Sequence, residues 1–143
     1  MKNLKLGLIA LGIALCFGAN AQNTITIKVK NVQKRAGTIV ADLCKSPNKF
    51  MEESIKKVTI AIPSDGDIVF TFPNVPKGVY AVRLYQDVNK DGKIETGFFS
   101  IPLEPFGFSN NASATFGPPS FGEASFNVIQ NYALSIDLRK TID

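Results

Sequence analysis

Three short oxygen-bearing side chains alternate along one stretch of this chain. Asp87, Asn89 and Asp91 precede Gly92, which is the spacing of the first half of a calcium-binding loop. Calcium takes roughly six to eight oxygen ligands, and alternate short side chains on a tight turn can all point at one ion. The carbonyl of the following lysine and a nearby glutamate would add further ligands. The spacing therefore predicts a metal site made of Asp87, Asn89, Asp91, Lys93 and Glu95.

The match to a complete calcium loop breaks down at its end. The twelfth position, where such a loop carries a bidentate glutamate, is Phe98. A carboxylate from elsewhere, such as Glu104 or Glu123, would have to complete the shell. The alternative, which the missing twelfth ligand favours, is a metal-free hairpin turn whose Asp and Asn side chains bond backbone amides. If calcium binds, we expect a weak dissociation constant, on the order of 10⁻⁴ to 10⁻³ M.

Phenylalanine is concentrated just after this stretch, since seven of the eleven Phe residues lie between Phe98 and Phe126. In one interpretation the rings anchor a long loop to the body while amides fix its backbone. In the other, exposed rings and amides form a platform for a sugar or peptide. Anchoring is favoured because Phe is more often buried than exposed. Both interpretations use the same side chains, which are Phe106, Phe108, Asn110, Asn111, Phe116 and Phe121.

Groups suited to acid–base or nucleophilic catalysis are scarce. The chain has no histidine, so nothing of that kind can activate the thiol of Cys44. We expect Cys44 to be buried and inert at the end of a strand. Nearby carboxylates offer a glycosidase-like pair, but their spacing fits ion binding or a turn better. These carboxylates are Asp87, Asp91, Glu95 and Glu104. The sequence predicts no catalytic residue and, apart from calcium, no cofactor.

The first residues predict export. Lys2 and Lys5 precede an apolar run from Leu6 to Phe17, and Ala19-Asn20-Ala21 has the small-x-small pattern of a signal-peptidase site. The run is short against the roughly 20 residues that span a bilayer. We therefore expect a signal peptide over residues 1–21, a mature domain over residues 22–143 without a membrane span, and a periplasmic or extracellular location.

The charge balance excludes a nucleic-acid surface. The whole chain has 16 Lys and Arg against 12 Asp and Glu, and the expected signal peptide removes two of the lysines. The remaining 14 basic residues are scattered, whereas nucleic-acid binding needs a clustered basic stripe. A protein or carbohydrate ligand is the expected partner.

Apolar and polar residues alternate along seven segments, which predicts seven β-strands. They cover residues 24–30, 38–44, 57–62, 67–72, 79–86, 124–128 and 133–138. A short helix is expected near residues 46–53, where Ser46 and Pro47 suit a helix start. The fold class is therefore an all-β antiparallel sandwich, with a closed barrel as the alternative. We expect the first two, the middle two and the last two strands of this set to form hairpins, the middle pair being residues 57–62 and 67–72.

Taken together, these segments resemble the DUF2141 family of exported bacterial proteins of unknown function. The resemblance rests on FPNVPKGVYAV at residues 72–82, DVNKDGK at 87–93, GFSNNA at 107–112 and FGPPSF at 116–121. It implies one exported domain with an immunoglobulin- or transthyretin-like sandwich, and it assigns no catalytic residue. We therefore expect a binding or interaction module. The alternatives are a structural accessory domain of an envelope assembly and a carboxylate-dependent hydrolase.

Overall fold

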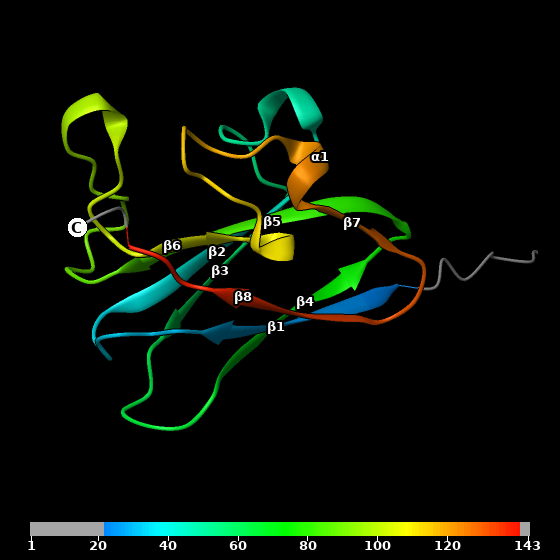
Figure 1. Ribbon diagram of the computed structural model, residues 1–143. Coiled ribbons are helices and arrows are strands. Elements are labelled where there is room, and N and C mark those ends of the chain that lie inside the picture. Colours follow the sequence, from blue (N-terminus) through cyan, green and yellow to red (C-terminus); the bar gives the residue numbers. More distant parts are fainter. Residues whose placement is uncertain (1–21, 141–143) are drawn as a thin grey trace, which may run out of the picture.

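The computed structural model describes residues 22–140, which form two packed β-sheets (Figure 1). The first sheet has the strand order β4-β1-β8, built from Ile68–Val75, Asn23–Lys30 and Tyr132–Asp137. The second has the order β3-β2-β5-β6, built from Lys56–Ala61, Thr38–Cys44, Gly78–Asp87 and Phe106–Phe108, and β7 (Ser125–Val128) also pairs with β5. The predicted all-β sandwich is confirmed. The predicted signal peptide lies outside the described residues.

Helical structure in the described part of the chain is limited to single turns. The α-helix α1 spans Phe121–Ala124, and 3₁₀ turns span Pro47–Lys49, Phe98–Ser100 and Ser109–Asn111. The first of these 3₁₀ turns is the short helix expected near residues 46–53, with proline at its start. Strand β6 is an addition to the seven predicted strands, because its three residues are too few to display an alternating pattern.

The main core lies between the two sheets and explains the alternation. Each strand turns every second side chain inward, where these side chains are buried. The inward set includes Ile25, Ile27, Ile39, Leu43, Ile68, Phe70, Phe72, Val82, Leu84, Phe126 and Ile136. Tyr80 joins the same core, and its hydroxyl donates a hydrogen bond to the carbonyl of Pro76 at 2.8 Å. This bond fixes the tight corner between β4 and β5.

Strand pairing differs from the three expected hairpins. β1 pairs with β4 and with β8, whereas β2 pairs with β3 and β5. β3 and β4 lie in different sheets, and β7 pairs with β5 while β8 pairs with β1. The β1–β8 pair is also parallel, so the sandwich is not purely antiparallel. The reason is that each of these connections crosses between sheets, so consecutive strands bury their apolar faces across the core.

A second, smaller core covers the outer face of the second sheet. The long connection from β5 to β7 folds back over that face, as Figure 1 shows. The buried members are Cys44, Phe50, Ala81, Phe106, Phe108 and Ala124. Because of this cover, both faces of β5 are buried near its middle, and its backbone polar groups need partners inside the protein.

Ser109 fills a gap in the hydrogen bonding of β5. One edge of β5 is shared by β7, opposite residues 78–81, and by β6, opposite residues 83–85. Val82 lies between them, and its N–H donates to the Ser109 hydroxyl at 2.8 Å. That hydroxyl in turn donates to the carbonyl of Ala124, and Ser109 is fully buried. One side chain thus joins β5, β6 and the end of α1.

Replacing this hydroxyl should therefore destabilise the fold. Ser109→Ala leaves the Val82 N–H without its partner and should lower the free energy of unfolding by about 1–3 kcal/mol. Urea denaturation followed by circular dichroism measures the change. The control is Ser113→Ala, because Ser113 is exposed and its hydroxyl is hydrogen-bonded to that of Thr115, which is also exposed. The control should change stability by no more than about 0.5 kcal/mol. Equal effects would contradict the role of Ser109.

Candidate functional site

The acidic loop (residues 87–95) is closed by the side chains that the sequence predicted as metal ligands. Asp87 ends β5, is buried, and accepts hydrogen bonds from the N–H groups of Asp91 at 3.2 Å and Gly92 at 2.8 Å. Asn89 Oδ1 accepts from the Asp91 N–H at 3.1 Å, and Asp91 Oδ1 accepts from the Lys93 N–H at 2.9 Å. These bonds make a tight turn, which Gly92 completes with a left-handed φ of 77°.

The Asn89 amide lies between two carboxylates of this loop. Its Nδ2 donates to Asp91 Oδ2 at 3.3 Å and to Glu95 Oε1 at 2.7 Å. A cation in that place would need an oxygen of Asn89 rather than its NH₂ group. Within residues 22–140, no three His, Cys, Asp or Glu side chains are grouped so as to hold a metal ion. The calcium site stays a prediction, and the hydrogen bonds favour the metal-free turn.

Glu104 clamps the two ends of the acidic loop. It is buried, and its two carboxylate oxygens accept hydrogen bonds from the Val88 N–H at 2.9 Å and the Glu95 N–H at 3.2 Å. Glu123, the other carboxylate considered for the metal shell, caps α1 instead, where its carboxylate accepts a hydrogen bond from the Ser120 N–H at 2.7 Å. The backbone and hydroxyl bonds from Ser120 lower the pKa of Glu123. Glu104 is therefore the residue that reaches the loop.

The chain between the acidic loop and Glu104 forms a small hairpin, here termed the tip hairpin (residues 95–103). The Leu103 N–H donates to the Glu95 carbonyl and the Gly97 N–H to the Ile101 carbonyl, both at 2.8 Å. At its turn, Phe99 and Ser100 both have a left-handed φ of 56°. Two consecutive left-handed residues are typical of a type I′ hairpin turn, which normally uses Asn and Gly. Backbone hydrogen bonds thus hold the two sides of the tip hairpin together, and its turn is strained.

The tip hairpin displays apolar side chains to solvent. Phe98 is 91% exposed and Phe99 is 95% exposed, and Leu103 is 62% exposed. Ile94 and Ile101 add further exposed apolar area beside them. These residues were not among the site residues predicted from the sequence. The sequence did contain a signal for them. Phe98 and Phe99 follow Gly97 in a segment that lacks the alternating pattern of a strand, so no pattern predicted burial of either ring.

Most of the predicted aromatic and amide residues anchor the long connection. Phe106 and Phe108 are buried in the second core, and the half-buried Phe121 ring lies 5.7 Å from that of Phe50. Asn110 donates hydrogen bonds to the carbonyls of Glu123 and Ser125, and Asn111 accepts one from the Asp137 N–H. Phe116 differs because its side chain is fully exposed. These residues, apart from Phe116, therefore anchor the long connection to the body of the protein.

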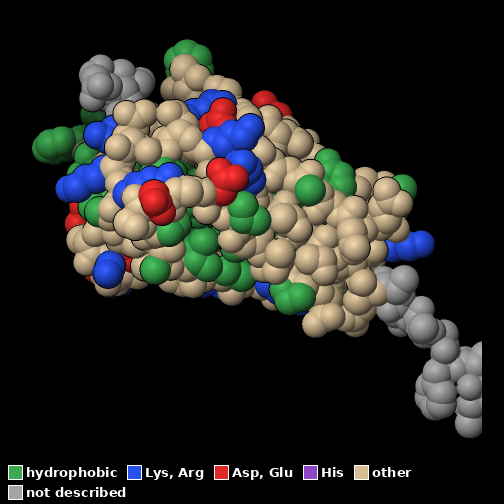
Figure 2. All heavy atoms as spheres, turned by 90° about the horizontal axis from the view of Figure 1, so that it is seen from below, with side chains coloured by type: hydrophobic (Ala, Val, Ile, Leu, Met, Phe, Trp, Pro, Cys, Tyr) green, Lys and Arg blue, Asp and Glu red, His purple; other side chains and the backbone are tan. Residues whose placement is uncertain are grey.

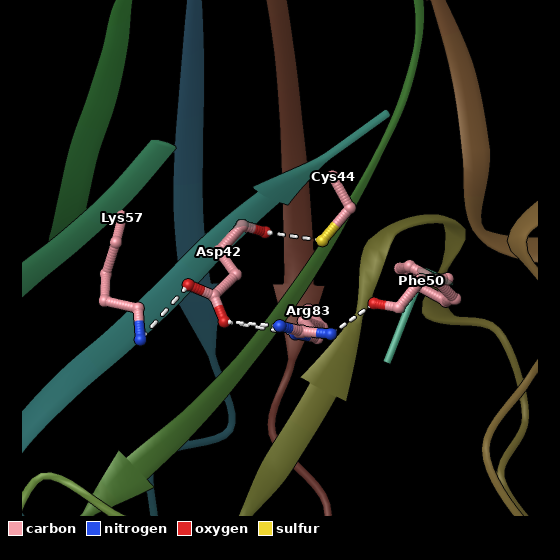
Figure 3. A network of polar contacts seen from close by, with 5 residues as sticks. All are labelled: Asp42, Cys44, Phe50, Lys57 and Arg83. Atoms are coloured by element: carbon pink, nitrogen blue, oxygen red, sulfur yellow. Dashed lines mark hydrogen bonds and ion pairs between the residues drawn. The ribbon is translucent and has the colours of Figure 1, made fainter. Parts of the chain in front are cut away.

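An ion pair on the outer face of the second sheet, which carries the smaller core, joins β2, β5 and the end of the first 3₁₀ turn (Figure 3). Arg83 donates from Nε and Nη2 to Asp42 Oδ2 at 3.1 and 3.0 Å, and from Nη1 to the Phe50 carbonyl. Lys57 Nζ lies 3.6 Å from the other Asp42 oxygen. Cys44 is turned toward the Asp42 carbonyl, and burial raises the pKa of its thiol to about 11. At neutral pH the thiol is therefore protonated and a poor nucleophile.

A cavity of about 340 Å³ lies beside the acidic loop, over β2 and β3. Its lining is Thr38, Val40, Lys57, Thr59, Asp87, Lys90 and Gly92. A hydrolase of the glycosidase type needs two carboxylates facing across such a space. This lining contains one, and that carboxylate is bonded to the backbone of its own loop. The geometry of this cavity gives no support to the hydrolase alternative.

The surface carries mixed charge. Figure 2 shows Lys and Arg side chains interspersed with Asp and Glu on one face, and hydrophobic side chains protruding at the left edge. That edge is the end of the molecule where the tip hairpin lies in Figure 1. Residues 22–140 contain no helix with the length and apolarity needed to cross a membrane.

Comparison with known proteins places the chain in a family. The family model described as an uncharacterized protein conserved in bacteria (DUF2141) matches residues 27–136. This match covers both sheets and the long connection, so the chain belongs to the DUF2141 family, as its motifs predicted. Neither the curated proteins nor the solved structures gave a significant match.

The clamp made by Glu104 can be tested by removing one of its acceptors. Glu104→Gln keeps the shape but turns an NH₂ group toward a backbone N–H, so it should lower the free energy of unfolding by about 1–3 kcal/mol. Chemical denaturation measures this loss, and amide exchange at Val88 and Glu95 should quicken. The control is Glu53→Gln, an exposed carboxylate 2.5 Å from Lys49 Nζ, which should change stability by at most about 0.5 kcal/mol. Similar values for the two variants would refute the clamp.

The calcium prediction has its own test. Because the carboxylates of the acidic loop already bond to backbone amides and to Asn89, we expect the melting temperature to stay constant on addition of millimolar calcium. Differential scanning calorimetry with and without chelator measures it. Binding at the affinity predicted for an extracellular site would instead raise the melting temperature, because a ligand that binds only the folded state stabilises it. Loss of that rise in Asp91→Asn would then place the ion in this loop.

Proposed function

We propose that the protein is an exported binding module whose contact surface is the tip hairpin. The N-terminal segment of the sequence supports export. The two packed sheets form a body from which one long connection extends (Figure 1). The acidic loop and Glu104 serve to hold the tip hairpin in place. In this proposal, the residues that the sequence marked as metal ligands have a positioning role.

One observation carries the proposal, namely the exposure of two adjacent phenyl rings on a strained turn. Phe98 and Phe99 are 91% and 95% exposed. Leaving a Phe side chain in water rather than buried forgoes about 1.5–3 kcal/mol. A left-handed residue other than glycine adds about 1–2 kcal/mol of strain. The first term is stabilisation that the fold forgoes and the second opposes folding, so together they favour a role in contact with something outside the domain.

The two remaining alternatives receive less support. A purely structural accessory domain needs no displayed aromatic pair, although it would share the same scaffold. A hydrolase needs a second carboxylate opposite Asp87, which the lining of the cavity lacks. Binding of a sugar through Asn110 and Asn111 would require breaking their bonds to the backbone. An apolar contact at the tip hairpin is the best-supported function.

The proposal predicts that the tip hairpin retains the protein in the cell envelope. After expression with its own N-terminal segment, wild-type protein should sediment with washed envelope fractions. Phe98→Ser/Phe99→Ser should shift it to the soluble fraction, because the variant removes the two exposed rings. Immunoblotting of both fractions measures the shift. The melting temperature should stay within a few degrees, since neither side chain is buried.

A matched control separates the tip hairpin from general surface hydrophobicity. Leu103→Ser and Ile129→Ser remove side chains that are each 62% exposed. Leu103 lies in the tip hairpin, whereas Ile129 follows β7 at the opposite end of the molecule (Figure 1). Only the Leu103 variant should weaken sedimentation. Unchanged sedimentation of the double Phe variant would rule out the tip hairpin as the contact surface.

A further inference from the structure

We propose that the partner of the tip hairpin is a lipid bilayer surface, into which its apolar side chains insert. This inference rests on the proposed function and specifies the chemistry of its partner. The inserted set would be Phe98, Phe99, Ile101 and Leu103, which are all exposed.

The composition of the tip hairpin suits a lipid interface. From Thr96 to Leu103 the chain has no charged residue. The flanking Glu104 is buried and bonded to the acidic loop, so it presents no free charge at the surface. A charge-free apolar segment of this size can enter the boundary between headgroups and acyl chains, as the apolar face of an interfacial helix does.

Backbone hydrogen bonding within the tip hairpin also suits immersion. Polar backbone groups that enter lipid must be paired inside the protein. The Gly97 and Ile101 N–H groups donate to the Ile101 and Phe98 carbonyls, and the Leu103 N–H donates to Glu95. Pro102 has no N–H to satisfy. These three hydrogen bonds therefore stay intact when the tip hairpin moves from water into the lipid interface.

Shape favours lipid over a folded protein partner. A stable protein interface buries roughly 800 Å² on each side, with about 20–30 residues and pockets for its anchor side chains. The exposed apolar group here comes from one hairpin that projects from the body, as Figure 1 shows. None of the exposed apolar side chains of the tip hairpin lines the cavity beside the acidic loop, so they form no pocket with it for a partner's anchor residue. A bilayer needs no complementary pocket, because hydrophobic burial is non-directional.

The charges around the tip hairpin indicate how binding should depend on salt. The exposed basic residues Lys90 and Lys93 are balanced by the exposed carboxylates of Asp91 and Glu95. With the buried carboxylates of Asp87 and Glu104 included, residues 87–104 carry two Lys against four Asp and Glu, a net charge of −2, so no positive charge at the base of the hairpin draws it to anionic headgroups. Insertion should therefore depend on apolar burial, with little change between low and high salt.

Flotation with lipid vesicles tests the inference directly. Mature protein purified after export is mixed with vesicles of phosphatidylcholine alone, or of phosphatidylethanolamine with phosphatidylglycerol. Both vesicle types should carry the wild-type protein to the top of a gradient, at low and at high salt. Phe98→Ser/Phe99→Ser should reduce the partition coefficient by roughly tenfold or more. Leu103→Ser should reduce it measurably, whereas Ile129→Ser should not.

Three results would overturn the inference. If wild-type protein fails to float with either vesicle type while it still sediments with the envelope, the partner is not lipid, although the proposed function stands. If binding is confined to the anionic vesicles and disappears in high salt, charge rather than apolar insertion drives it. If the Phe98-Phe99 pair instead supports self-association without lipid, seen as a dimer in analytical ultracentrifugation that the double variant abolishes, the partner is a second copy of the chain.

Discussion

The backbone of β5 has to be hydrogen-bonded along both edges, and the rest of the structure follows from how this is done. β2 covers one edge from Ala81 to Asp87. The other edge is divided between β7 and β6, and the Ser109 hydroxyl serves Val82 in the gap. β6 lies within the long connection and β7 follows it, so the chain leaves β5, returns to pair with it through β6, and pairs with it again through β7. The acidic loop and the tip hairpin are therefore positioned by the central strand of the sheet rather than by a flexible tether.

Buried charge on the outer face of the second sheet is arranged to hold neighbouring elements. Arg83 joins β5 to β2 through Asp42, and to the segment before β3 through the Phe50 carbonyl. Glu104 joins the chain before β6 to both ends of the acidic loop. A buried pair of this kind adds little net stability, because desolvation offsets the attraction, but loss of one partner is strongly destabilising. Such groups therefore determine geometry more than they determine the free energy of unfolding.

This geometry places backbone strain and exposed phenyl rings together in the tip hairpin, whereas the exposed Phe116 ring stands alone on another part of the long connection. Phe99 and Ser100 have left-handed backbones at the turn where Phe98 and Phe99 meet solvent. Elsewhere on the long connection, Phe106 and Phe108 are buried, and Asn110 and Asn111 fasten the backbone. A scaffold stabilised by two cores can tolerate this local cost, and an exposed apolar tip is useful only where a contact covers it. The binding proposal and the lipid inference both follow from this contrast.

The sequence by itself determined the strand positions and the all-β class, because a strand that faces a core must alternate apolar and polar residues. It also predicted the turn at residues 87–95, since Asp and Asn next to Gly92 suit a turn with or without metal. Only the tertiary structure decided which strands pair, because alternation is the same in a hairpin as in a crossing between sheets. It also decided which Phe side chains face water. Phe98 and Phe106 are chemically identical, and their difference in exposure arises from elements distant in sequence that cover one ring and leave the other uncovered.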